Sequence, residues 1–289
     1  MLRTVRAMDL LFVKVALAPL IILIATLIAR RLGPRAGGFF IGLPTTALPF
    51  MPTMYLMLGL ESAVVTATGA ITGQLTCALF CIAYPRTGPR LGALSSMVAA
   101  LAVAAVLGLA TVALGAPMVV AGLALVVILA GLLTWPAVTG ELTPARNRRW
   151  DLPLRMGMAC VTVVTVSSLQ PYLGTALAGA VASLPTILMV MCPAVHHAEG
   201  VGNAVELTRG TLTSIPATVV YLVSFVLLAP HVGMWWALAV SLVAIPITTV
   251  AVSRGPVLLR EVVRFRRPLT TSGTSEPERS RPGPVLTQR

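Results

Sequence analysis

Charged residues are scarce in this chain of 289 residues: they make up only 10% of it, and just nine are acidic. Aromatic residues add 5%, whereas 57% of the residues are hydrophobic and the mean hydropathy is +0.92. Such a composition excludes a soluble domain, whose surface needs far more polar side chains. Apolar stretches of about 20 residues follow one another along the chain, and each is long enough to cross a bilayer core.

Sequence signatures of catalysis are also missing. The chain has no phosphate-binding lysine loop, no H-E-x-x-H zinc helix, no nucleophile elbow and no carboxylate pair in a hydrophilic loop. We therefore expect neither an enzyme nor a bound cofactor. No loop could form a nucleotide-binding domain, so transport would draw on an ion gradient, the substrate's own gradient or a partner protein.

Cysteine is rare, and nothing in its placement indicates a disulfide framework. Cys77 and Cys81 share a helix face and could hold a metal, but small apolar residues packing between helices explain them better. Cys160 and Cys192 also fall inside apolar stretches.

The apolar pattern predicts an all-α integral membrane protein with about nine transmembrane helices. The expected spans are 9–30, 38–59, 61–84, 91–114, 117–138, 152–171, 174–197, 203–228 and 232–252.

An internal repeat is the most informative pattern in the chain, which matches itself without gaps at an offset of 141 residues. The motif L-G-x4-G-x4-L-P-T occurs at 32–45 and again at 173–186. The register continues: Pro52 matches Pro193, Gly59 matches Gly200 and Gly69 matches Gly210. Shared apolar composition alone should give several times fewer identities, so the repeat indicates two related halves.

The nine expected spans divide into a first group of four, a single linking span and a second group of four. Residues 1–114 hold the first repeat, 115–151 a linker span with a cytoplasmic loop, and 152–253 the second repeat. An odd number of spans between matched positions inverts the second copy, which is how many secondary transporters are built. We expect 254–289 to be a basic, mostly disordered cytoplasmic tail.

The net charge of +12 is better explained by membrane topology than by nucleic acid. Arginines cluster in alternate connections, near 30–35, 86–90, 146–149 and beyond 254. The positive-inside rule then puts these connections and the C-terminus in the cytoplasm and the N-terminus outside. Only one of the 21 basic residues is a lysine, which favours a GC-rich bacterial genome and hence an inner membrane.

The two L-P-T segments are the predicted substrate site. A proline inside a span removes a backbone donor and frees a carbonyl, which lipid tolerates only where protein or a water-filled cavity faces the break. Packing of two kinked helices is the alternative. The residues expected to line the site are Gly42, Pro44, Thr45, Thr46, Ser183, Pro185 and Thr186.

Cations occur at matched positions of the first span of each half, Lys14 and Arg155. Each lies several residues into its span, where burial costs at least about 2.5 kcal/mol unless the side chain snorkels or is paired. One interpretation is a functional pair of cations that attracts an anionic substrate from alternate sides of the membrane. The alternative is that each side chain snorkels to the membrane surface. Helix N-termini at the breaks would add partial positive charge.

Carboxylates near span ends are the candidates for ion coupling. Glu61 and Glu199 could titrate near neutrality if partly desolvated. Glu206 and Arg209 are spaced i,i+3 on one face, which favours structural pairing.

A metal site is the rival interpretation of some of these spans. Thioether, thiolate and imidazole groups suit soft or borderline metals such as Cu(I), Zn²⁺ or Ni²⁺. Met51, Met54 and Met57 recur every three residues, and methionines at that spacing are also ordinary core residues. The residues concerned are Met51, Met54, Met57, Cys192, His196 and His197.

Taken together, the sequence predicts a secondary transporter that moves a small, anionic solute by alternating access. The alternatives are a flippase for a polyprenyl-phosphate or phospholipid, a metal-ion transporter and a non-transporting scaffold subunit. Its expected partners are membrane lipids and a small-molecule or lipid-phosphate substrate, with a homo-oligomer left open. The substrate, the coupling ion and the direction of transport do not follow from the sequence.

Overall fold

The computed structural model describes residues 20–44, 51–52, 55–56, 59–112, 115–136, 153, 156–157, 161 and 185–265. Within these residues the chain is all-helical, without strands. The described residues up to Ser253 belong to one compact unit. Lys14, Thr45, Thr46, Met54, Met57, Arg155 and Ser183 lie outside the described part.

Seven helices are bounded as follows: α2 Pro34–Gly42, α4 Leu60–Thr87, α5 Ala93–Val112, α6 Pro117–Leu133, α9 Thr186–Glu199, α10 Val201–Val232 and α11 Met234–Phe265. A further helical segment covers 20–32. Three stretches are long and apolar enough to cross a membrane: α4, α10 and the part of α11 up to Val252. In the described part of the chain the fold is therefore that of an all-α protein compatible with a membrane location, and the nine spans stay a prediction.

Four of the connections turn at a glycine whose φ is positive. Gly33, Gly59, Gly200 and Gly233 have φ of 92°, 86°, 90° and 79°. Side chains clash with the backbone in this region, so glycine is the residue that makes such sharp joints between consecutive helices.

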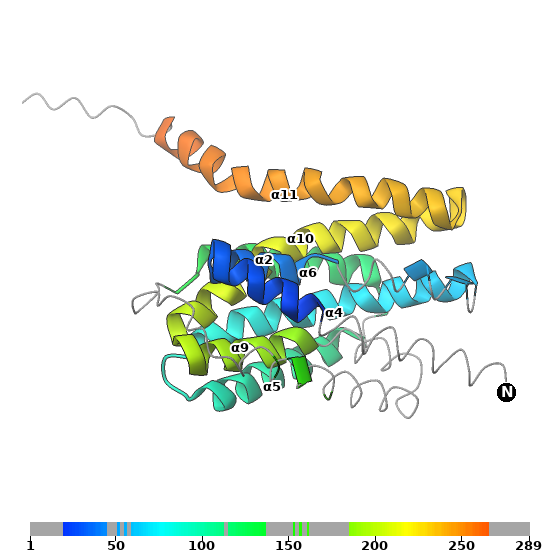
Figure 1. The fold of residues 1–289 in the computed structure, drawn as a ribbon. Helices are drawn as coiled ribbons and strands as arrows, with labels where there is room; N and C mark the ends of the chain where they lie inside the picture. The colour runs from blue at the N-terminus through cyan, green and yellow to red at the C-terminus, as the bar shows by residue number, and fades with distance from the viewer. Residues whose placement is uncertain are drawn as a thin grey trace, which may run out of the picture. The chain divides into compact units, whose positions relative to one another are not determined.

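Helix α2 packs against the first two-thirds of α10, as Figure 1 shows. A Cβ on Gly38 would overlap the Leu207 carbonyl, and one on Gly210 would overlap the Arg35 carbonyl. The backbones are thus in direct contact, which is the close approach that small residues permit between membrane helices. Gly42 is equally tight, since its Cβ would overlap the Ser214 hydroxyl.

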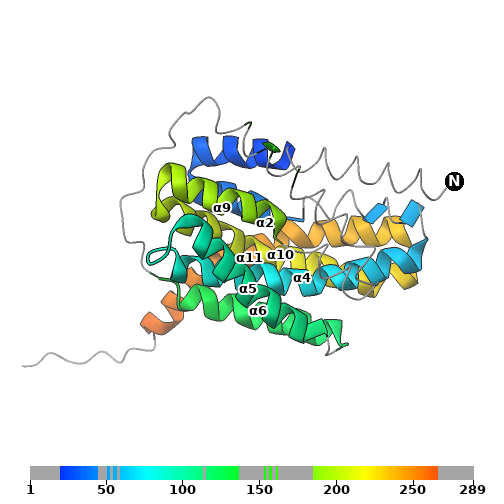
Figure 2. The same cartoon turned by 90° about the horizontal axis from the view of Figure 1, so that it is seen from below.

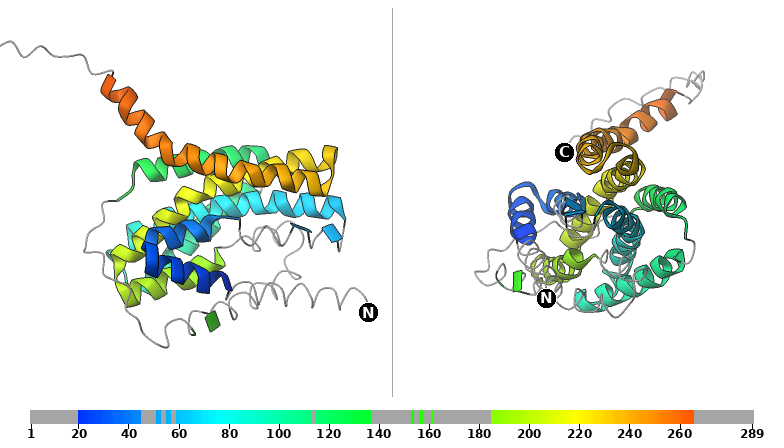
Figure 3. Two further views of the ribbon diagram at one scale, coloured as in Figure 1. Left: turned by 45° about the horizontal axis from the view of Figure 1, so that its top comes forward. Right: turned by 90° about the vertical axis from the view of Figure 1, so that its right-hand side faces the viewer.

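Helix α4 packs against three neighbours: α10, α5 and α6 (Figures 2 and 3). Small residues again allow the approach. A Cβ on Gly108 of α5 would overlap the Thr76 hydroxyl, and one on Gly131 of α6 would lie 2.5 Å from Ile82 Cδ1. At the end of α4, Arg86 donates to Thr134 Oγ1 at 2.9 Å and so ties α4 to the end of α6.

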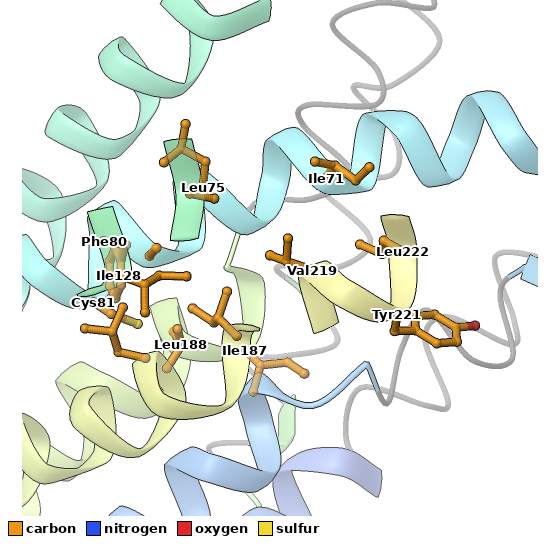
Figure 4. Close-up of a cluster of buried hydrophobic side chains, with 14 of the residues drawn as sticks. Ile71, Leu75, Phe80, Cys81, Ile128, Ile187, Leu188, Val219, Tyr221 and Leu222 are labelled. Carbon is orange, nitrogen blue, oxygen red and sulfur yellow. The ribbon is translucent and has the colours of Figure 1, made fainter. Parts of the chain in front are cut away.

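A buried apolar cluster joins α4, α6, α9 and α10 (Figure 4). Its close-packed side chains exclude water from between these helices and so hold them together. The labelled members are Ile71, Leu75, Phe80, Cys81, Ile128, Ile187, Leu188, Val219, Tyr221 and Leu222.

Candidate functional site: the helix ends at the two L-P-T segments

The first L-P-T segment coincides with the end of a helix. Helix α2 stops at Gly42, and Leu43 is extended, with φ −68° and ψ 157°. Pro44 follows and is buried. Proline cannot continue the helical hydrogen bonds and disfavours a helical residue before it, which explains the stop.

Threonines of α10 bond to the backbone of α2 beside this end. Thr211 Oγ1 donates to the Gly38 carbonyl at 2.9 Å, and Thr218 Oγ1 donates to the Gly42 carbonyl at 2.7 Å. The Gly42 carbonyl lies in the last turn, where no helical N–H is available, so Thr218 supplies its missing donor. Because the partners rise together along both helices, α2 and α10 run parallel.

The second L-P-T segment coincides with the start of a helix. Helix α9 begins at Thr186, directly after the buried Pro185, and within the described residues no side chain caps its N-terminus. The first amides of a helix lack intrahelical partners and carry partial positive charge. Ile187, in this first turn, belongs to the same buried apolar cluster as Val219 of α10 (Figure 4).

The end of α2 therefore meets α10 half-way along its axis. Thr218 is the eighteenth of the 32 residues of α10, which at a rise of about 1.5 Å per residue is the middle of a helix of about 48 Å. Of the predicted site residues, Gly42 lies at the middle of α10 and Pro44 follows shortly after it, while Pro185 and Thr186 stand at the start of α9.

Sequence reasoning missed the residues of α10 that face the end of α2. Thr211, Ser214, Thr218 and Tyr221 recur every three to four residues, which places them on one face of the helix. Polar side chains at helical spacing inside an apolar stretch were the available signal for a polar face on this helix.

Replacing Thr218 by valine should remove the donor of the Gly42 carbonyl at nearly constant volume. We expect a loss of about 1 kcal/mol, the size of a hydrogen bond between membrane helices, and a fall of about 2–4 °C in the unfolding midpoint in detergent. Thr248→Val is the control, because Thr248 Oγ1 bonds to Ala244 of its own helix at 2.8 Å. Equal midpoints for the two variants would mean that the Thr218 bond contributes nothing.

The coupling candidates are spread over three helices, α4, α9 and α10. Glu61 is exposed in the first turn of α4. Glu206 pairs with Arg209 at 3.5 Å, as the i,i+3 spacing predicts. Glu199 accepts a hydrogen bond from Asn203 Nδ2 at 3.2 Å. The described carboxylates therefore do not gather at the middle of α10.

The residues of the metal interpretation are similarly separated. Within the described residues, no group of three or more His, Cys, Asp and Glu side chains comes together as a metal site. Met51 and Cys192 are buried in the apolar core, and His197 is exposed. His196 Nδ1 lies 3.1 Å from the Tyr84 hydroxyl, a hydrogen bond that occupies this ring nitrogen.

Tyr55 and His196, which are 141 residues apart and so matched in the repeat, each make an aromatic contact. His196 meets Tyr84 edge-on, with centroids 6.1 Å apart, and Tyr55 meets Trp235 edge-on at 6.2 Å. Their backbone carbonyls accept matching hydrogen bonds: the amide of Gly59 donates to Tyr55 and that of Gly200 donates to His196.

Comparisons with known proteins find no family model that matches the chain and no characterised protein or solved structure similar to it.

Proposed function

We propose that the protein is a secondary transporter of the inner membrane that moves a small anionic solute by alternating access. The observation that carries the proposal is that a helix ends or begins at each L-P-T segment: α2 ends at the first, half-way along α10, and α9 begins directly after the second. Transporters place substrate and ion sites where discontinuous helices end near the bilayer midplane.

The matched turns support the proposal that the two halves share one plan. Gly59 and Gly200 have the same backbone geometry, φ 86° and ψ 177° against φ 90° and ψ 166°. Each follows a segment that contains one L-P-T motif and precedes a long apolar helix, α4 in the first half and α10 in the second.

The close contact between α2 and α10 adds a sequence argument. In the repeat, Gly38 and Gly42 correspond to Gly179 and Ser183, while Gly210 and Ser214 correspond to Gly69 and Gly73. The tight Gly42–Ser214 pair thus becomes Ser183–Gly73, so each copy keeps one glycine and one serine. The pattern predicts that the second L-P-T segment makes on α4 the contact that α2 makes on α10.

The contacts also agree with the topology proposed from the arginines. Arg86 meets Thr134, and Tyr84 meets His196, which joins three connections assigned to the cytoplasm. The contact of Tyr55 with Trp235 joins two connections assigned to the outside. The parallel course of α2 and α10 is what the proposed order of spans requires.

The preference for an anion rests on one helix N-terminus and on two cations of the sequence. The N-terminus of α9, which no described side chain caps, offers amides with partial positive charge. Lys14 and Arg155 are full charges at matched positions of the sequence. An anion is the substrate that such a set of groups stabilises.

Thermal unfolding of the detergent-purified protein against a ligand panel tests the proposal. The panel holds organic carboxylates, phosphate, a short polyprenyl phosphate, Zn²⁺, Ni²⁺ and Cu(I). At about 100 times its Kd a ligand should stabilise the fold by roughly 2.7 kcal/mol. We expect a shift with carboxylates or phosphate that is reduced in Lys14→Ala and Arg155→Ala.

Other outcomes would name another function. A shift with the polyprenyl phosphate alone favours a flippase, and one with metals alone favours a metal carrier. No shift with any ligand would contradict transport of these substrate classes and favour a scaffold subunit.

A further inference from the structure

Tyr221 of α10 combines complete burial with an unused polar group. Its side chain is 0% exposed, and its hydroxyl has no hydrogen-bond partner in the described part of the chain. A buried hydroxyl without a partner costs free energy, so the native fold normally provides one. Figure 4 shows the ring turned away from the apolar cluster around Cys81, Ile187 and Leu188.

The position of Tyr221 places it at the first break. It lies one helical turn beyond Thr218, on the face of α10 that contacts α2. Because α2 ends at Gly42, opposite Thr218, this face continues past the end of α2 to Tyr221. Tyr221 therefore lies on the face of α10 that is level with the first L-P-T break.

The matched residue of the repeat shows that packing alone does not require a hydroxyl here. Phe80 stands 141 residues earlier and is also 0% exposed, within the apolar cluster. A phenyl ring therefore suffices at the corresponding position of α4. The additional oxygen of Tyr221 needs a separate explanation.

We propose that Tyr221 is a substrate-binding residue whose hydroxyl donates a hydrogen bond to a carboxylate or phosphate oxygen of the transported anion. The inference rests on the function proposed above and adds a specific donor to it. The anion supplies the hydrogen-bond acceptor that the described part of the fold does not. The phenol hydroxyl adds a short, directional contact to the less directional attraction between the anion and positively charged groups.

Tyr221→Phe tests this, with Tyr84→Phe as the matched control. Tyr84 is equally buried, but its hydroxyl bonds to His196. Without ligand, we expect Tyr221→Phe to keep or raise the unfolding midpoint and Tyr84→Phe to lower it. With succinate or inorganic phosphate as the probe, Tyr221→Phe should raise Kd by about ten- to hundredfold, the effect of losing a hydrogen bond to a charged group. The two probes distinguish a carboxylate from a phosphate ligand.

Each contrary result has a separate meaning. A lower midpoint of ligand-free Tyr221→Phe would show that the hydroxyl has a partner within the fold and would overturn the inference. Equal affinity of Tyr221→Phe and the wild type for a probe that binds would overturn it too, while leaving the transport proposal intact. A wild type that binds neither probe would overturn the anion proposal and this inference together.

Discussion

Gly210→Ala should cause one of the largest losses of stability of any single methyl group added to this protein. The new Cβ would overlap the Arg35 carbonyl of α2, so two backbones would have to separate. Backbone atoms cannot move aside as side chains do, and we expect a loss of about 3 kcal/mol, at the upper end for overpacking. The unfolding midpoint in detergent should fall by about 6–12 °C.

Gly122→Ala is the control for this variant. Gly122 lies in α6, and a Cβ there would have nothing within 4 Å. Since alanine is a better helix former than glycine by roughly 1 kcal/mol, this variant should keep or raise the midpoint. Gly210→Ala gains the same propensity, so its loss can come only from the contact with α2. Similar midpoints for both variants would contradict the direct backbone contact.

Pro44→Ala and Pro185→Ala should abolish transport while the protein remains folded in the membrane. Proline follows the end of α2 at the first L-P-T segment and precedes the start of α9 at the second, and alanine is more favourable inside a helix by about 3 kcal/mol. We therefore expect α2 to extend beyond Gly42 and α9 to begin before Thr186, which removes both helix ends from the L-P-T segments. The measurement is uptake into proteoliposomes of whichever anion stabilises the wild type.

Pro230→Ala provides the comparison for these two variants. Pro230 lies near the end of α10, twelve residues after Thr218, and so far from the breaks. It should leave uptake close to that of the wild type. Full uptake by both Pro44→Ala and Pro185→Ala would show that the breaks serve helix packing alone.

The helices themselves could be predicted from the sequence because their signals are local. The expected spans 61–84, 203–228 and 232–252 correspond to α4, α10 and α11, and 117–138 corresponds to α6. Proline chemistry marked the end of α2 and the start of α9. The end of α10 differs by a few residues, since it continues to Val232, past the expected end at 228, whereas α11 continues to Phe265, well past the expected end at 252.

The partners of these segments could not be predicted, because they depend on pairing between distant residues. Thr218 donates to a carbonyl 176 residues away, and its spacing gives no indication of that partner. Tyr221 lies buried in the core, although tyrosine is a residue type common at membrane interfaces. The repeat contained more of this information than composition did, as the match of Tyr221 with Phe80 shows.

The glycine contact between α2 and α10 has a mechanical consequence. Backbone atoms in contact leave no flexible side chains between the helices, so α2 and α10 form one rigid body that cannot slide or shear internally. Any rearrangement must then be accommodated at joints outside that body. Gly59 and Gly200 provide such joints, with a backbone freedom that other residues lack. The contact thus predicts a stiff pair of helices, α2 and α10, with the two matched glycine turns as the places where neighbouring helices can change direction.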